Sequence, residues 1–151
     1  MPIRLAGTHD IDTIADVFVA SFAGLTFLPK LHTDADTRRW IREEMVPRHE
    51  VWVAELEGEI VGFAALSGDL LSHLYVHPAA QRRGVGTALL GLVKAERPNG
   101  FRLWTFQRNE AARRFYERNG CQIVQLTDGS GNEEKEPDVL YEWVGAGSSR
   151  S

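Results

Sequence analysis

Cysteine is nearly absent from this chain. Cys121 is the single cysteine among 151 residues, so no internal disulfide can form, and the chain suits a reducing compartment. Long hydrophobic runs are also missing, whereas a membrane-spanning helix needs about 20 apolar residues in succession. The first residues, Met1 to Leu5, lack the apolar stretch of a signal peptide. We therefore expect a cytoplasmic protein with no membrane partner.

The chain has fewer positively charged than negatively charged residues. Lysine and arginine number 17 against 21 aspartates and glutamates, a formal net charge of -4. Nucleic-acid-binding domains are usually basic, so we expect no nucleic-acid partner. A metal cluster is missing too: His73 and His77 have the spacing of a helical zinc pair, but a strand would place them about 13 Å apart. We expect no metal site.

The rest of the composition is that of a globular domain. A hydrophobic content of 43% and a charged content of 25% allow one domain with a substantial core. We place this single domain at residues 1–144. Residues 145–151 are small and polar, and we expect a disordered tail there.

The most informative stretch is a strand, a glycine loop and a helix in succession. Residues 71–76 are apolar and are followed by Pro78, which cannot continue a strand. Residues 81–86 are polar and contain two glycines, and helical spacing of apolar residues begins at Val85. The first N–H groups of a helix lack internal partners and carry partial positive charge. This arrangement suits a phosphate or a pyrophosphate.

Two common phosphate loops do not fit this stretch. The dinucleotide fingerprint would need a third glycine where Leu89 stands, and the run of a P-loop is missing. The pattern Gln81-x-x-Gly84-x-Gly86 instead resembles the coenzyme A pyrophosphate loop of the GNAT acetyltransferase superfamily. A strand-to-helix turn without a ligand is the alternative for this loop alone.

A second motif strengthens the resemblance. Residues 109–121 are similar to a later helix of the superfamily, Asn-x-x-Ala-x-x-Phe-Tyr-x-x-x-Gly-Phe, and depart from it only at Cys121. We expect Cys121 to be a small buried filler, with an acetyl relay as the alternative. The resemblance is specific from about residue 70 to residue 121.

The resemblance implies an α/β (α+β) fold, the GNAT fold. Its central sheet is mixed and mostly antiparallel, with about seven strands, a splayed parallel pair and about four flanking helices. Residues 71–76 and 101–106 would form that pair, and Trp104 and Phe106 would lie in the core. The resemblance also implies acetyl-CoA as cofactor and transfer of acetyl to a primary amine of a small molecule or a peptide. The alternative is a module that binds coenzyme A without turnover. The oligomeric state is left open by the sequence, and a homodimer is one alternative, since members of this fold are often dimers.

The resemblance assigns site residues one by one. Main-chain groups of the central strand would hold the pantetheine arm, and the loop would hold the pyrophosphate. The expected cofactor contacts are Leu74, Tyr75, Val76, Gln81, Arg82, Arg83, Gly84, Val85, Gly86, Thr87, Asn109 and Tyr116.

The expected chemistry needs a proton donor and a proton acceptor. By resemblance Tyr116 would protonate the leaving thiolate, and the Val76 N–H would polarise the carbonyl. Relatives often carry a base on the central strand, but Leu70 and Ser72 occupy the matching positions. His73 is a candidate base only if a bulge turns it, because strand alternation points it to the other face. The alternative is that water carries the proton away.

The acceptor is not identified by the sequence. Residues 22–40 and those after Thr127 are where the superfamily varies most. The link over 127–138 is acidic, which favours either a solvated hairpin tip or an acidic lip that attracts a cationic amine.

Overall fold

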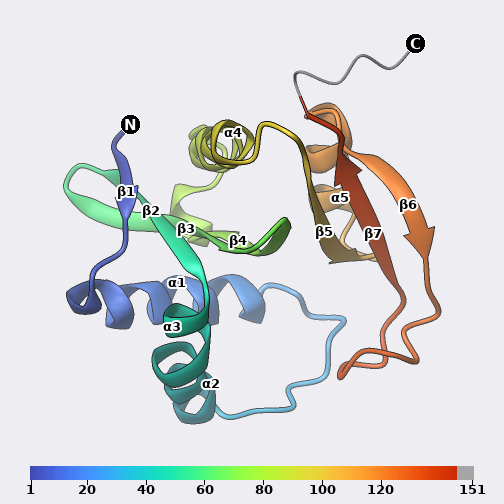
Figure 1. Cartoon of the computed structure of the whole chain (residues 1–151). Coiled ribbons are helices and arrows are strands. Elements are labelled where there is room, and N and C mark those ends of the chain that lie inside the picture. The colour runs from blue at the N-terminus through green and yellow to red at the C-terminus, as the bar shows by residue number, and fades with distance from the viewer. Residues whose placement is uncertain (146–151) are drawn as a thin grey trace.

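One seven-stranded sheet organises the molecule, with helices on both of its faces (Figure 1). The structure is a computed structural model that describes residues 1–145, so the tail expected over 145–151 lies outside it except for Gly145. The strand order is β1-β2-β3-β4-β5-β7-β6, and every neighbouring pair is antiparallel except β4 with β5. The predicted mixed, mostly antiparallel sheet is thereby confirmed.

The bounds of the elements follow the chain closely. The strands are β1 (Ile3–Leu5), β2 (Glu50–Leu56), β3 (Glu59–Ser67), β4 (Leu70–Val76), β5 (Phe101–Phe106), β6 (Gln122–Leu126) and β7 (Asp138–Trp143). The α-helices are α1 (Ile11–Ala23), α2 (Asp34–Trp40), α3 (Val46–Arg48), α4 (Val85–Glu96) and α5 (Glu110–Arg118). No helix within the described residues has the length and apolar character that crossing a bilayer requires.

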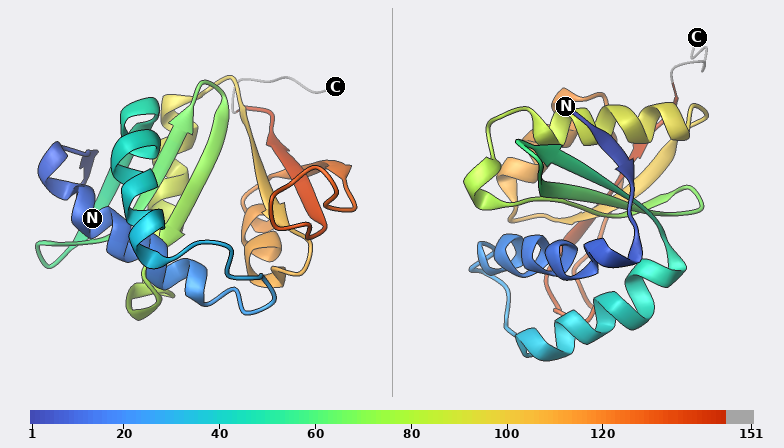
Figure 2. Two further views of the ribbon diagram at one scale, coloured as in Figure 1. Left: turned by 90° about the horizontal axis from the view of Figure 1, so that it is seen from below. Right: turned by 90° about the vertical axis from the view of Figure 1, so that its left-hand side faces the viewer.

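Two hydrophobic clusters lie on the two faces of the sheet. The first contains buried residues of α4 and α5, such as Leu89 and Tyr116, packed on β4, β5 and β7. The second contains residues of α1 and the α2 region, such as Phe18 and Ile41, packed on β2 and β3. Figure 2 shows α1 and α4 on opposite faces of the strands. The sheet therefore separates an α4/α5 face from an α1/α2 face.

The second helical segment runs past the point where the sequence predicts its end. The sequence predicts a helix that starts at Asp34 or Asp36 and ends before Pro47, because proline disrupts a helix interior. A π-helical turn (Ile41–Met45) instead joins α2 to α3, which includes Pro47. The Val46 N–H bonds the Ile41 carbonyl, five residues back. Pro47 lies just beyond the π turn and can donate no main-chain hydrogen bond there. With α2, this turn and α3 forming one body, the described chain has the expected four helical bodies.

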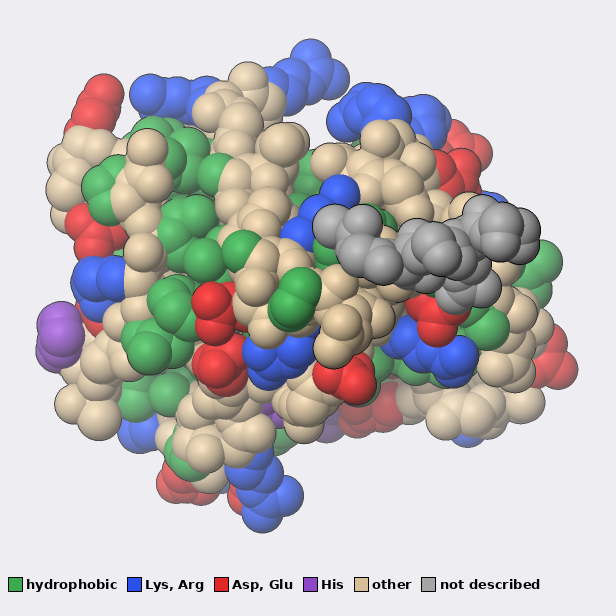
Figure 3. All heavy atoms as spheres, turned by 45° about the horizontal axis from the view of Figure 1, so that its top comes forward, with side chains coloured by type: hydrophobic (Ala, Val, Ile, Leu, Met, Phe, Trp, Pro, Cys, Tyr) green, Lys and Arg blue, Asp and Glu red, His purple; other side chains and the backbone are tan. Residues whose placement is uncertain are grey.

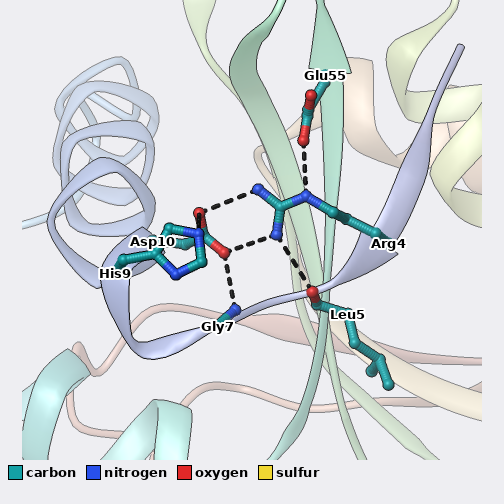
Figure 4. Close-up of polar contacts among 6 residues, drawn as sticks. All are labelled: Arg4, Leu5, Gly7, His9, Asp10 and Glu55. Carbon is teal, nitrogen blue, oxygen red and sulfur yellow. Dashed lines mark hydrogen bonds and ion pairs between the residues drawn. The ribbon is translucent and has the colours of Figure 1, made fainter.

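A buried carboxylate ties α1 to the edge of the sheet (Figure 4). Asp10 is 4% exposed, and its carboxylate accepts hydrogen bonds from the Arg4 guanidinium at 2.7 and 3.1 Å. It also accepts the Gly7 N–H at 2.7 Å, while the Arg4 Nε donates to Glu55 on β2 at 2.7 Å. The Arg4 hydrogen bond is the main reason why the pKa of Asp10 falls from 3.8 to about 2.

Replacing Asp10 with asparagine is expected to lower the free energy of unfolding by about 2 kcal/mol at neutral pH, since hydrogen bonds to charged groups are lost. Because the folded pKa is depressed, this stabilisation is full well above pH 3.8 and is lost as the pH falls towards 2. Urea unfolding at several pH values measures it. The control is Asp12→Asn, whose carboxylate pairs with Arg42 and is 84% exposed. Equal effects of the two substitutions would contradict the prediction.

Candidate active site

The parallel strands β4 and β5 part after two paired positions. Leu70 pairs with Arg102 and Leu71 with Leu103, and no further pairs join the two strands (Figure 1). β5 remains paired with β7 along its whole length, from Phe101 to Phe106. A gap therefore opens between the C-terminal halves of β4 and β5, as the resemblance implies.

Main-chain groups of β4 alternate between β3 and this gap. The His77 N–H donates to the Val61 carbonyl on β3 at 2.7 Å. Because every second residue of a strand turns its N–H and carbonyl to the same neighbour, those of Tyr75 also face β3. Leu74 and Val76 then turn their main-chain groups to the gap. The Val76 carbonyl fits this direction, since it accepts side-chain hydrogen bonds from Ser21 at 3.0 Å and Gln81 at 3.3 Å. Of the three predicted main-chain contacts, Leu74 and Val76 face the gap and Tyr75 faces β3.

The glycine loop leads from β4 into the N-terminus of α4. Gly84 is the N-cap residue at φ 81° and has no side chain with which to satisfy the first N–H groups of the helix. The N–H groups of Val85, Gly86 and Thr87 therefore remain available to an anion. A Cβ at Gly86 would lie 3.4 Å from the Phe115 ring, so α4 and α5 approach closely here.

Positive charge accompanies the loop. Arg82 takes a left-handed conformation at φ 65°, and the Arg82 and Arg83 side chains are exposed. Arg83 makes only a loose ion pair with Glu57, at 3.9 Å. In the space-filling view, lysine and arginine side chains gather along the upper margin of the face on the α4 side (Figure 3). A gap between strands that ends beside an uncapped helix N-terminus fits a long ligand with a pyrophosphate.

Tyr116 lies beneath the point where the strands part. It projects from α5, whose N-terminus is capped by the Asn109 side chain accepting the Ala112 N–H at 3.2 Å. Tyr116 is 7% exposed and packs in the same cluster as Leu71 and Leu103, the last paired residues of β4 and β5.

The hydroxyl of Tyr116 has no hydrogen-bond partner in the part of the chain that the structure describes. Burial raises its pKa well above the usual range. No hydrogen bond joins it to another group within residues 1–145, whereas every fully enclosed side-chain nitrogen or oxygen there has a partner. The Tyr116 hydroxyl therefore keeps some contact with open space and can donate to a group that enters the gap.

His73 lies on the other face of the sheet. A bulge in β4 places Ala65 opposite His73 but Leu66 opposite Leu71, so alternation shifts at Ser72. The ring of His73 then lies among aromatic rings of the α1/α2 face, 5.6 Å from those of Phe18 and Trp40. Burial, together with His49, lowers the pKa of His73 to about 4. The bulge that His73 would need in order to act as the base is present. His73 and Tyr116 nevertheless lie on opposite faces of the sheet.

The two variable segments meet beside the gap (Figure 2). Arg108 donates to the Phe27 carbonyl at 3.1 Å, and the Phe27 ring lies 6.0 Å from that of Phe106. His32 in the segment after α1 also pairs with Glu133 in the segment between β6 and β7. These contacts enclose the end of β5 on the α1/α2 face.

Two expectations about side chains are corrected by the structure, and one is confirmed. Trp104 is 44% exposed rather than part of the core, because α5 covers only the other face of β5. Phe106 is half-buried and lines an open pocket. Cys121 is 4% exposed in the α4/α5 cluster, as expected of a core filler.

A comparison with known families decides what this site belongs to. A model described as an acetyltransferase (GNAT) domain matches residues 47–122. This chain belongs to the GNAT acetyltransferase family. The GNAT protein is accordingly an N-acetyltransferase, and acetyl-CoA is its cofactor.

Individual relatives agree with that assignment. The peptidyl-lysine N-acetyltransferase YiaC of Escherichia coli (strain K12) is 34% identical over 124 residues, which cover 81% of this GNAT chain and 84% of YiaC. The solution structure of apo-form YjaB from Escherichia coli has a TM-score of 0.78 at 23% identity and covers 96% of this chain and 98% of YjaB. yncA, a putative acetyltransferase from Salmonella typhimurium with its cofactor acetyl-CoA, has a TM-score of 0.71 at 19% identity, with coverages of 100% and 97%. The two structures show that the fold is shared.

Proposed function

We propose that this GNAT protein transfers the acetyl group of acetyl-CoA to a primary amine of a peptide or a small molecule. The observation that carries the proposal is the gap between β4 and β5, which leads from the uncapped N-terminus of α4 to the Tyr116 hydroxyl. The relative YiaC is named a peptidyl-lysine N-acetyltransferase, which makes a lysine side chain the first peptide amine to test.

The residues that would hold acetyl-CoA fall into two groups. The Leu74 and Val76 main-chain groups in the gap suit the amides of a pantetheine arm. The loop N–H groups and the charges of Arg82 and Arg83 suit the pyrophosphate. Gln81 links the start of the glycine loop to the end of β4, since its side chain donates to the Val76 carbonyl at 3.3 Å. In this proposal Asn109 acts through its capping of α5, which sets the position of Tyr116.

Each chemical task falls to a different group of the chain. Acetyl-CoA supplies the activated acetyl group as a thioester. The Val76 N–H points into the gap and can donate to the carbonyl oxygen as negative charge grows on it. The Tyr116 hydroxyl, kept protonated by burial, can give its proton to the departing sulfur. The acceptor amine must lose a proton, either to His73 or to water.

Replacing His73 with phenylalanine tests the first of these two routes. We expect kcat/KM to stay within about threefold of the wild type from pH 6 to pH 9, because a histidine with a pKa of about 4 is a weak base and stays neutral throughout. Phenylalanine preserves the aromatic packing against Phe18 and Trp40. A fall of about 100-fold with an altered pH profile would instead make His73 the base.

The proposed function is tested by turnover. Purified protein and acetyl-CoA are incubated with lysine peptides, peptide N-termini and small amines, and release of free coenzyme A thiol is followed. Release that depends on both substrates, with acetylated product confirmed by mass, is the expected result. Tight acetyl-CoA binding without turnover of any amine would favour the alternative of a module that only binds coenzyme A.

A further inference from the structure

An open pocket of about 730 Å³ lies where the end of β5 meets the segment between β6 and β7. Its lining includes Trp104, Phe106, Gln125, Asn132, Glu134 and Asp138. Trp104 pairs with Leu140, which pairs with Gln125, so these residues form one row across β5, β7 and β6. Trp104 is exposed on the face that α5 leaves uncovered, and the pocket therefore adjoins the gap on the α1/α2 face.

Glu134 differs from the other acids of its segment. It is half-buried and, within residues 1–145, makes no hydrogen bond or ion pair. The other carboxylates of residues 127–138 are all engaged. Asp128 accepts the Ser130 N–H, Glu133 pairs with His32, Glu136 pairs with Arg108, and Asp138 accepts from Thr127 and Asn132.

The charge of Glu134 reaches the side chain of Tyr75 on β4. Its carboxylate adds to the effect of burial in raising the pKa of the Tyr75 hydroxyl to about 12. Among the described residues, no lysine, arginine or histidine lines the pocket to compensate this carboxylate. Trp104 and Phe106 line the same pocket, and aromatic rings attract cations through their faces. A half-buried carboxylate that shares a pocket with two aromatic side chains suits a positively charged group.

We propose that this pocket receives the part of the acceptor beyond the reacting nitrogen, and that Glu134 selects acceptors that carry a second positive charge there. The inference rests on the proposed function and narrows its substrate class to dicationic amines, whether free diamines or amines within basic peptides. The pocket is much larger than one amino group needs, so a second group of the acceptor can lie along β5 towards Gln125.

Three acceptors of one chain length test this selection. These are 1,5-diaminopentane, pentylamine and 5-aminopentanoate, which place a positive, a neutral and a negative group at the far end. We expect kcat/KM for the diamine to exceed that for pentylamine at least about tenfold. The two equivalent amino groups of the diamine would by themselves raise kcat/KM only about twofold. The value for 5-aminopentanoate should be the lowest of the three. The difference should lie in KM, because Glu134 binds the distal group and leaves the reacting atoms untouched.

The variant Glu134→Gln should reduce the preference for the diamine to about twofold, and Glu134→Lys should make 5-aminopentanoate better than the diamine. Glu133→Gln is the matched control, because Glu133 belongs to the same segment but lies outside the pocket, and it should leave the wild-type order unchanged. Binding of the three amines to the protein saturated with coenzyme A, measured by calorimetry, gives a second readout.

A wild type that does not prefer the diamine, or a Glu134→Gln variant that keeps the preference, would overturn the inference. Failure of all three amines both to bind and to react would overturn it as well. Turnover of other amines would in that case leave the proposed function standing, whereas absence of acetyl transfer to every amine would remove both.

Discussion

Tyr116→Phe is expected to lower kcat by about 100-fold or more while leaving the affinity for acetyl-CoA nearly unchanged. A positioned proton donor contributes about 10²- to 10⁴-fold to a rate, and phenylalanine removes only the oxygen. The buried ring still fills its place in the α4/α5 cluster, so the fold should be retained. Steady-state kinetics together with direct measurement of acetyl-CoA binding separates the two effects.

Tyr141→Phe is the matched control for this substitution. Tyr141 is also buried in the α4/α5 cluster, but its hydroxyl bonds Arg113 and Glu117 instead of facing the gap. It should lower stability rather than kcat. If Tyr116→Phe kept more than half of the wild-type kcat, or if both variants lost it equally, Tyr116 would not be the proton donor.

The pH dependence of the wild type follows from the same burial. Because burial raises the pKa of Tyr116, the hydroxyl stays protonated above the pH at which an exposed tyrosine, with a pKa of about 10, ionises. Loss of this acid should therefore cause no alkaline fall in kcat below about pH 10.

Thr87→Glu is expected to weaken acetyl-CoA binding by about 100-fold and yet leave the protein as stable as the wild type or slightly more so. Thr87 is exposed in the first turn of α4. A carboxylate there would face the pyrophosphate that the loop is proposed to hold, and two like charges about 5 Å apart repel by a few kcal/mol near a protein surface. The same carboxylate favours the helix dipole by about 0.3–1 kcal/mol.

Thr87→Glu is thus expected to weaken acetyl-CoA binding without lowering the stability of the protein, so a loss of binding cannot be explained by unfolding. Thermal unfolding without ligand and titration with acetyl-CoA at low and high salt measure the two quantities, and salt should shrink the loss of affinity. Thr87→Gln has the same shape without the charge and should bind within about threefold of the wild type. Unchanged affinity in Thr87→Glu would place the pyrophosphate away from the N-terminus of α4.

Local patterns predicted the elements around the site well. The strand before Pro78, the loop over 81–86 and the helix from Val85 all depend on residues close together in sequence. The helix predicted to end before Pro47 shows the limit of such patterns. A π turn allowed that helix to continue, because packing of Ile41 and Met45 in the α1/α2 cluster outweighs the local preference.

Features that depend on residues far apart were beyond the sequence. The bulge at Ser72 arises from pairing with β3, and it decides which face His73 joins. Ser21 reaches the Val76 carbonyl from α1, 55 residues away, and no local signal marks it. Glu134 stands out from its acidic neighbours only because their partners, such as His32 and Arg108, come from distant segments.

The sequence by itself determined the family, the cofactor and the glycine loop before α4, because the two motifs and the helical spacing that mark them each lie within a short stretch of the chain. The tertiary structure decided which main-chain groups of β4 face the gap, that Trp104 is exposed, and that Glu134, unlike the other carboxylates of its segment, makes no hydrogen bond or ion pair within residues 1–145. Those outcomes depend on strand register and on long-range pairing, and both are set by how the whole chain packs.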